Sequence, residues 1–373
     1  MNFSINKTIF YNALQIVSHA ISSTSPQPSL RGILINVQND SIVMTGSDAD
    51  ISIRKTITKD DKNQLNVIEE GSILIESRYL LEIVRKIDSE TIDIEIIDGA
   101  LTKFSGSSAV FKINGMNPND YPNINFLQPE TYINISAASL QEIISQTAFA
   151  ASVKETRPVL TGVNFRFSNG ILVCTGTDSF RLARKTIPFE NEGSFNVTIP
   201  AKGLSEVKNS ILQDPASSIS MYMDNRKAQF VNEDTIIQTK LLDGAFPETD
   251  RLIPKEFNYT MHISRSDLIS AVDRTVFIKT ENMAIVRLQC SKDEIILSNK
   301  NQEIGESRET LAASFEGEDL DISFSAAYVI EAARSLPGPE LKIGFTGEMK
   351  PFVIFSEGDE TVLQLVLPVK TYN

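Results

Sequence analysis

An internal repeat of 130 residues constrains the fold of this chain more than any other feature. When the sequence is shifted by that length, 12 of the 30 positions from 28 to 57 are identical, without a gap. The conserved pairs run from Pro28 and Pro158 to Ile57 and Ile187, and they include the aspartates Asp48 and Asp178. So much identity at a fixed spacing predicts a structural unit that occurs more than once.

Helix-like segments with an apolar stripe support this organisation. One segment precedes the block in each copy, and a third lies 128 residues after the second: Asn6–Ile21, Ser136–Arg157 and Ser264–Lys279. The first residue of each can supply a side-chain oxygen to free amides of the first helical turn. Second helix-like segments follow, each leading into strand-like text: Ser77–Asp88, Ala201–Leu212 and Ala326–Leu336.

The pattern predicts an α+β fold of three similar domains, each with two helices and several antiparallel strands. Residues 115–130 and 241–257 are rich in Pro, Gly, Asn and Asp, which suit linkers. We therefore expect domains at residues 1–128, 129–253 and 254–373.

The composition indicates a packed protein of the cytoplasm. The 373 residues are 41% hydrophobic and 22% charged. The N-terminal residues lack the apolar core of a signal peptide, and no apolar run is long enough to cross a membrane. Cys174 and Cys290 lie in strand-like text, so we expect buried free thiols and a reducing environment.

No enzyme motif is recognisable in the sequence. The two histidines, His19 and His262, have no nearby Cys or carboxylate at metal-ligand spacing, and no phosphate-binding loop or nucleophile elbow occurs. Asp48, Asp50 and Asp178 are the best catalytic candidates. However, Phe180 stands where Asp50 does in the other copy, so we interpret Asp48 and Asp178 as turn residues that accept backbone amides.

The charge distribution points to helices that face a polyanion. The chain carries a net charge of −13, whereas the six helix-like segments contain twelve basic and eight acidic residues. The helices therefore carry +4 and the remainder −17. Six helices about 10 Å across, placed side by side in a ring, leave a hole of roughly 9 Å, and twelve leave roughly 28 Å. Only the larger hole admits a DNA duplex, so a ring around DNA needs two chains.

Several stretches make the sequence similar to the bacterial sliding clamp family, the beta subunits of DNA polymerase III. They are "MNFSINKTIFYNALQIVS", "TGTDSFRLA", "TKLLDGAFPETDRLIP", "FSAAYVIEAARSL" and "LVLPVK". Their order and spacing extend the resemblance over the whole chain.

The resemblance implies a ring-shaped homodimer with helices lining the pore and sheets outside. It implies a non-catalytic processivity factor without cofactor or metal, which encircles duplex DNA irrespective of sequence. The implied partners are the replicative polymerase, the clamp loader and other proteins with a clamp-binding motif, and no membrane.

The resemblance also assigns sites residue by residue. DNA contacts would involve Arg78, Arg85, Lys154, Arg157 and Lys202. The dimer joint would join Phe111 and Ile113 to Phe277 and Ile278 of the other chain. A pocket for partner peptides would be formed by Leu160, Thr177, Arg181, Leu182, Pro247, Leu252, Met283, Tyr328, Phe352, Leu365, Val366, Leu367, Pro368 and Val369.

Two alternatives follow from the residues alone. A carboxylate-based or carbohydrate-processing enzyme would gather Asp48, Asp50 or Asp178 in a cleft. A repeat scaffold without a DNA role would form no ring.

Overall fold

The computed structural model describes residues 1–278, 283–301 and 303–370. They form two compact units, each with its own sheets. The first unit combines Met1–Gln141 with Lys202–Leu241, and the second combines Glu142–Ala201 with Leu242–Asn373.

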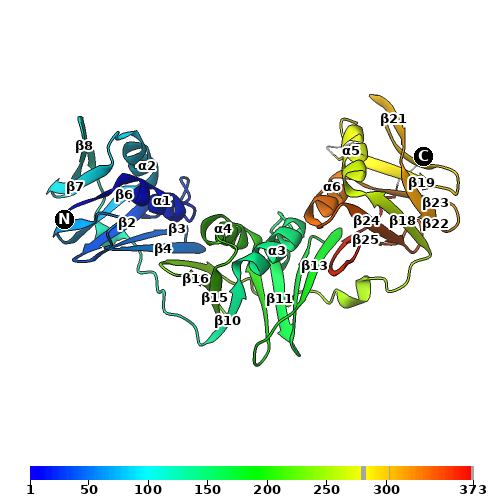
Figure 1. Ribbon diagram of the computed structural model, residues 1–373, viewed down its shortest axis with the longest axis horizontal. Helices are drawn as coiled ribbons and strands as arrows, with labels where there is room; N and C mark the ends of the chain where they lie inside the picture. The colour runs from blue at the N-terminus through cyan, green and yellow to red at the C-terminus, as the bar shows by residue number, and fades with distance from the viewer. Residues whose placement is uncertain (279–282, 302, 371–373) are drawn as a thin grey trace. The chain divides into compact units, whose positions relative to one another are not determined.

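The first unit contains two antiparallel sheets (Figure 1). The smaller sheet comprises β1 (Asn2–Asn6), β5 (Asn66–Glu69), β7 (Thr91–Asp98), β8 (Leu101–Gly106) and β9 (Ala109–Asn114), in the order β5-β1-β7-β8-β9. The larger sheet comprises β2 (Gly32–Gln38), β3 (Ser41–Ser47), β4 (Ile51–Thr58), β6 (Gly71–Glu76), β10 (Thr131–Ser136), β15 (Ser218–Met223), β16 (Lys227–Asn232) and β17 (Thr235–Lys240). Its order is β10-β15-β16-β17-β4-β3-β2-β6, so β4 and β17 join strands from two distant segments.

The second unit also contains two antiparallel sheets. The larger comprises β11 (Gly162–Ser168), β12 (Ile171–Thr177), β13 (Arg181–Pro188), β14 (Phe195–Pro200), β18 (Tyr259–Ser264), β22 (Ala313–Glu316), β24 (Glu340–Phe345), β25 (Phe352–Ser356) and β26 (Asp359–Val366). Its order is β14-β11-β12-β13-β26-β25-β24-β18-β22, with β13 and β26 as the joining pair. The smaller comprises β19 (Ile285–Cys290), β20 (Ile295–Asn301), β21 (Gly305–Thr310) and β23 (Leu320–Ser325), in the order β21-β20-β19-β23.

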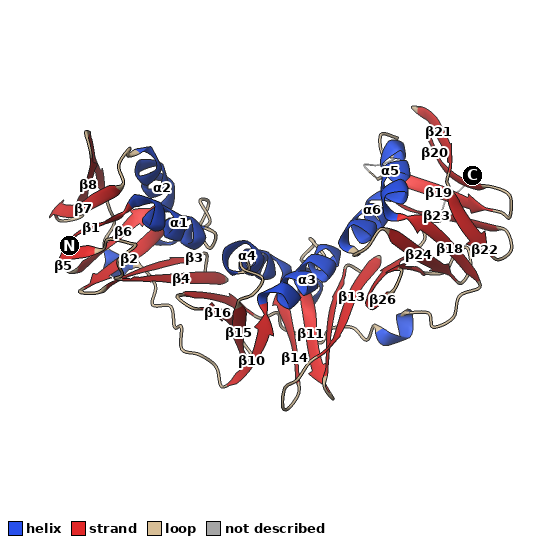
Figure 2. Ribbon diagram, in the orientation of Figure 1, coloured by secondary structure: helices blue, strands red, loops and turns tan. Residues whose placement is uncertain are grey.

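Six α-helices occur in the described residues: α1 (Lys7–Ser18), α2 (Ser77–Lys86), α3 (Ala137–Thr147), α4 (Ala201–Ile211), α5 (Arg265–Thr275) and α6 (Ala326–Ser335). In α1, Phe10, Ala13, Leu14 and Val17 are buried at helical spacing and face the sheet, as an amphipathic helix requires. Helices α5 and α6 pack side by side (Figure 2). Within the described part of the chain, no helix has the length and apolar character of a membrane span.

The structure confirms the sequence repeat strand by strand. Strands β2, β3 and β4 begin and end 130 residues before β11, β12 and β13. The turns after β3 and β12 are also equivalent, because Ala49 and Ser179 both have positive φ, at 79° and 77°. In the first copy, Asp48 Oδ1 accepts the amides two and three residues ahead, at 3.0 and 2.8 Å.

The predicted helix Ser136–Arg157 is too long. Helix α3 ends at Thr147, a short 3-10 helix covers Ala148–Ala150, and Lys154 and Arg157 lie in the loop that follows. Packing sets this end, because the Thr147 carbonyl lies against Gly176 of β12, where a side chain would collide with it. The helix-like pattern beyond Thr147 therefore does not continue the helix.

The capping predictions were right for two helices and wrong for one. Asn6 accepts the amides of Thr8 and Ile9, and Ser136 accepts that of Ser139. Ser264 makes no cap hydrogen bond, because its hydroxyl instead contacts that of Ser266 at 2.9 Å. The predicted end of this helix, Lys279, and the C-terminal Thr371–Asn373 lie outside the described residues.

Both cysteines are buried free thiols, as expected. Burial raises the pKa of Cys290 to about 12, and burial also raises that of Cys174. A thiol whose pKa is raised is a weak nucleophile, so neither side chain is suited to redox or catalytic chemistry.

Candidate partner-peptide pocket, basic residues and chain edges

Asp178 belongs to a turn, which confirms the structural interpretation. Its Oδ1 accepts the backbone amides of Phe180 and Arg181 at 2.9 and 3.0 Å. Its Oδ2 lies 3.1 Å from Arg181 Nε. The carboxylate therefore uses both oxygens to hold the turn, which is the arrangement of a structural aspartate.

Removal of the Asp178 carboxylate is expected to destabilise the fold. Asp178→Ala leaves the amides of Phe180 and Arg181 without their acceptor and removes one of the ion pairs of the Arg181 guanidinium, which costs about 2 kcal/mol in the free energy of unfolding. Urea unfolding of the full chain measures the effect. The control is Asp50→Ala, because the Asp50 side chain is 74% exposed and its one ion pair within the described part of the chain is with Lys240, at 3.1 Å; it is expected to cost less than about 0.5 kcal/mol. Equal costs for the two variants would contradict the turn role.

Arg181 is the best-fixed residue of the predicted peptide pocket. Its guanidinium is ion-paired with Asp178 and Glu331 and donates to the Phe149 carbonyl at 2.7 Å. The same group lies over the Tyr328 ring, 4.6 Å from the centroid, in a cation–π contact. The β12–β13 turn and helix α6 are thereby linked through one side chain.

The β13–β26 ladder brings further pocket residues together. Arg181 and Leu182 pair with Val366 and Leu365, and the Leu367 amide donates to the Phe180 carbonyl at 2.9 Å. Leu182 and Leu365 share an apolar cluster with Leu367. The segment that follows β26 therefore lies against the turn that contains Asp178, at one end of this ladder.

The remaining predicted pocket residues surround this ladder to different degrees. Phe352 pairs with Val366, Thr177 donates to the Arg181 carbonyl at 2.6 Å, and the Val369 amide donates to Ser323. Side-chain exposure divides the set. Leu160, Thr177, Leu182, Phe352, Leu365 and Val366 are buried, Arg181, Pro247, Tyr328, Leu367, Pro368 and Val369 are half-buried, and Leu252 and Met283 are exposed.

Three residues near this ladder were missed by the sequence reasoning: Phe149, Phe180 and Glu331. Phe149 and Glu331 hold the Arg181 guanidinium, and Phe180 is 60% exposed beside it. Phe180 carried a usable signal, because the first repeat has Asp50 at that position. An apolar residue that replaces a charged one on an exposed turn indicates a contact surface.

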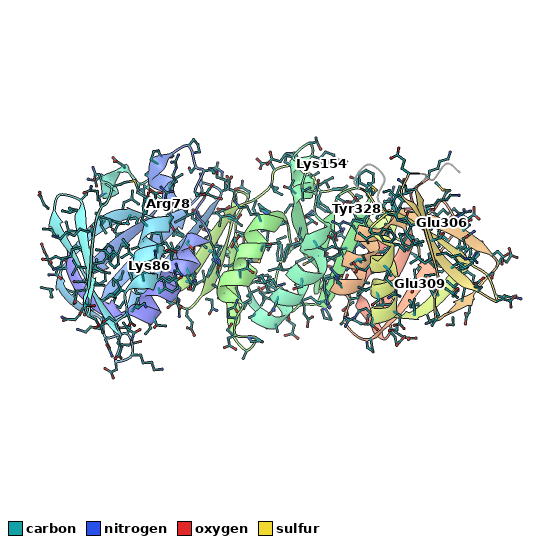
Figure 3. All side chains as sticks on the ribbon, turned by 90° about the horizontal axis from the view of Figure 1, so that it is seen from above. Arg78, Lys86, Lys154, Glu306, Glu309 and Tyr328 are labelled. Atoms are coloured by element: carbon teal, nitrogen blue, oxygen red, sulfur yellow. The ribbon has the colours of Figure 1, made fainter. Side chains whose placement is uncertain are left out.

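The predicted DNA-contact residues fall into two groups. Three are already engaged in ion pairs: Arg78 with Glu76 at 2.6 Å, Arg85 with Glu82 at 2.9 Å and Lys202 with Asp48 at 2.6 Å. Arg78 also lies over the ring of Tyr79, at 4.4 Å. Its position on α2 is labelled in Figure 3.

Lys154 and Arg157 form the second group. Both are exposed in the loop after α3, and neither has an acidic partner among the described residues. Figure 3 shows Lys154 at the tip of this loop. The six helices themselves contain nine basic and six acidic residues within their observed bounds, a net charge of +3. The positive character of the helices therefore survives the shortening of α3.

The predicted joint residues lie at or near two strand edges. Phe111 and Ile113 are half-buried on β9, an edge of the five-stranded sheet. Phe277 is 66% exposed, whereas Ile278 is only 1% exposed. Asn299 Nδ2 holds this segment by donating to the carbonyl of Ile278 at 2.8 Å.

The described residues contain no group of three or more His, Cys, Asp or Glu side chains placed to hold a metal ion.

A fold of repeated helix pairs on antiparallel sheets, with positively charged helices, is that of a DNA sliding clamp. Sequence profiles of the DNA polymerase III beta subunit match in order: the N-terminal domain at residues 1–125, the central domain at 134–248 and the C-terminal domain at 250–370.

Individual relatives agree over the full length. The chain is 36% identical to the beta sliding clamp of Bacillus subtilis and 33% identical to that of Staphylococcus epidermidis, with both chains covered completely. The chain therefore belongs to the DNA polymerase III beta subunit family, the bacterial DNA sliding clamps. Members of this family encircle DNA and bind the polymerase. The role of the chain is that of a DNA sliding clamp, and the subunit itself catalyses no reaction.

Solved structures give the same result. The crystal structure of the Bacillus subtilis clamp superposes with a TM-score of 0.94 at 36% identity, covering both chains fully. The beta chain of Streptococcus pneumoniae gives 0.94 at 31% identity, covering 99% of this chain. The clamp of Bartonella birtlesii, solved with bound griselimycin, gives 0.93 at 25% identity over both full chains.

Proposed function

We propose that two copies of this chain close head to tail into a ring around duplex DNA and tether partner proteins through a peptide pocket. Each chain would contribute three domains, at residues 1–128, 129–253 and 254–373. The replicative polymerase, the clamp loader and other proteins with a clamp-binding motif would use the pocket. The ring would work in the cytoplasm, where a bacterial chromosome is replicated.

The proposal rests on a strand pairing that occurs twice within the chain. A third pair of equivalent strands is present, but its two members are not paired with each other. Strand β4, the third strand after α1, pairs antiparallel with β17, the third strand after α4. Strand β13, the third after α3, pairs in the same way with β26, the third after α6. The remaining members of the series are β21, third after α5, and β9, third after α2.

Both remaining strands are sheet edges. Strand β9 ends the order β5-β1-β7-β8-β9, and β21 ends the order β21-β20-β19-β23. Exposed edges are templates for pairing with another chain. If β21 of one chain pairs with β9 of the next, the third seam repeats the first two. This joint uses unlike ends, so it produces a closed ring or a filament.

The size of the duplex favours a ring of two chains. The described residues of each chain supply six helices, and twelve helices side by side leave a hole of roughly 28 Å. The joint would bury Phe277 against Phe111 and Ile113 of the other chain. Acidic Glu306 and Glu309 on β21, labelled in Figure 3, would meet the basic end of α2, which contains Arg85 and Lys86.

Contacts with DNA would be sparse and independent of sequence. Lys154 and Arg157 are the strongest candidates, because no acidic side chain among the described residues neutralises them. Arg78, Arg85 and Lys202 would contact phosphates only by exchanging an intramolecular ion pair for an intermolecular one. Weak phosphate contacts of this kind depend on salt and do not fix a position on the duplex, so they permit sliding.

The pocket would accept an extended peptide with Leu and Phe anchors. Its half-buried apolar side chains next to a fixed guanidinium resemble sites that combine apolar pockets with a few oriented polar groups. The griselimycin complex of the Bartonella birtlesii clamp supports a ligand site in this family.

Topological linkage tests the proposal directly. The protein is loaded on nicked circular DNA by a clamp loader, and half of the sample is then linearised with a restriction enzyme. A closed ring is expected to remain on the intact circle and to leave the linear DNA through its ends. Retention on the linear DNA equal to that on the circle would overturn the proposal.

A further inference from the structure

We propose that an ion-paired clasp on the second linker positions Leu252 for peptide binding. The clasp consists of Arg166 and Arg184, which hold Asp250. This inference rests on the proposed pocket, of which Leu252 is a member. Arg166, Arg184 and Asp250 are outside the predicted pocket, so their role would be to position another residue.

The clasp fixes the linker to two strands of one sheet, β11 and β13, which lie on either side of β12. Arg184 on β13 is mostly buried, with Nη1 2.8 Å from Asp250 Oδ1 and Nη2 2.5 Å from Thr249 Oγ1. Arg166 on β11 reaches the other carboxylate oxygen, with Nη2 3.1 Å from Oδ2. A carboxylate held by two guanidinium groups has little rotational freedom, so its backbone is fixed as well.

Leu252 follows Asp250 by two residues in the same turn. Asp250–Leu252 form a single 3-10 turn, and the Leu252 amide donates to the Thr249 carbonyl at 3.0 Å. Leu252 is 54% exposed, so its own packing does not determine where it points. Fixing a turn fixes the direction of its side chains, which reduces the ordering cost of binding.

Apolar contacts anchor the linker beyond Leu252. Ile253 and Phe257 pack against the cluster of Leu182, Val353 and Leu365. The linker is thus held by charge before Leu252 and by apolar packing after it. Because the cluster also contains Leu367, the apolar anchor belongs to the predicted pocket, whereas the charged anchor is separate from it.

The first linker uses the repeat equivalent of Arg184 in the same way. Arg54, 130 residues earlier, lies over the ring of Phe126, 4.7 Å from its centroid. The two linkers also match in sequence, since Tyr121-Pro122 stands 125 positions before Phe246-Pro247. In both copies this arginine therefore contacts the linker that follows. The contact is with an aromatic ring in the first copy and with a carboxylate in the second.

The charge state of Asp250 suits the clasp. The hydrogen bond from Arg166 lowers the pKa of Asp250, assisted by the charges of both arginines and opposed by partial burial. The carboxylate is therefore ionised at neutral pH, and its ion pairs would be lost only as acid titrates it.

A double-mutant cycle tests whether Asp250 acts through Leu252. Asp250→Asn keeps the shape of the side chain and removes its charge, and Leu252→Ala removes the positioned group. Fluorescence anisotropy measures the affinity of the full chain for a fluorescein-labelled peptide whose only apolar residues are one Leu and one Phe. Asp250→Asn is expected to weaken binding on the order of fivefold. Asp243→Asn, an exposed residue of the same linker, is the matched control and should leave affinity unchanged.

The double variant distinguishes positioning from a general structural effect. If Asp250 acts through Leu252, the double variant binds no more weakly than Leu252→Ala alone. Additive losses, or unchanged affinity in Asp250→Asn, would overturn the clasp. Unchanged affinity in Leu252→Ala would instead remove Leu252 from the pocket and count against the proposed site itself.

Discussion

Phe277→Asp is expected to turn the two-chain ring into single chains while leaving each chain folded. The side chain is 66% exposed, so the substitution removes little from the core of its own unit. Asn299 Nδ2 donates to the carbonyls of Thr275 and Ile278, at 3.0 and 2.8 Å. The backbone on both sides of Phe277 is therefore held by the Asn299 side chain, and the Phe277 ring itself is exposed.

The expected effect on assembly is large. Loss of a central aromatic contact, together with burial of an unpaired carboxylate, costs about 3–4 kcal/mol per joint. A two-chain ring has two such joints and the substitution alters both, so the free energy of dissociation changes by about 6–8 kcal/mol, which corresponds to a dissociation constant on the order of 10⁴- to 10⁶-fold higher. Sedimentation velocity at low micromolar concentration should give one species with the mass of a single chain. Protein loaded on circular DNA should be lost correspondingly fast.

A second exposed phenylalanine provides the matched control for this experiment. Phe180 is 60% exposed and lies on the turn before β13, outside β9 and β21, the strands proposed to join. Phe180→Asp should therefore remain a dimer. If both variants dissociate, the effect is a general consequence of surface charge. If Phe277→Asp remains a dimer, the joint lies elsewhere.

The sequence was most informative where local pattern and repetition agree. The identities between residues 28–57 and 158–187 predicted equivalent strands, and β2–β4 and β11–β13 have equivalent bounds. The aspartate turns followed for the same reason, since Asp48 and Asp178 were shared while Asp50 was not. Comparison between copies thus separated residues that hold the fold from those free to acquire a second role.

Long-range contacts account for what the sequence did not predict. The end of α3 at Thr147 depends on the approach of Gly176, a residue 29 positions later. The pairing of β4 with β17 joins segments about 180 residues apart, as Lys55 and Thr235 illustrate. No periodicity encodes such a partner. The Arg181 contacts with Phe149 and Glu331 were missed for the same reason.

Replacing Leu367 and Pro368 by alanine is expected to give the largest loss of partner-peptide affinity. The Leu367 amide extends the β13–β26 ladder to the Phe180 carbonyl, and alanine retains this hydrogen bond. The lost groups are the half-buried isobutyl group of Leu367 and the ring of Pro368, which restricts the backbone. Loss of well-packed apolar contacts with a peptide anchor costs about 2–3 kcal/mol of binding free energy, or roughly 30- to 150-fold in the dissociation constant.

Leu363→Ala separates a pocket effect from a fold effect. Leu363 lies on β26, which ends just before Leu367, and both residues pack in the same apolar cluster. Leu363 pairs with Arg184 and is outside the predicted pocket. Both variants should lower the urea midpoint, because each removes packing from one cluster. Only Leu367→Ala with Pro368→Ala should also weaken binding of the labelled peptide. Equal affinities for that variant and Leu363→Ala would mean that the end of β26 contributes packing alone, and the peptide site would have to lie elsewhere on the chain.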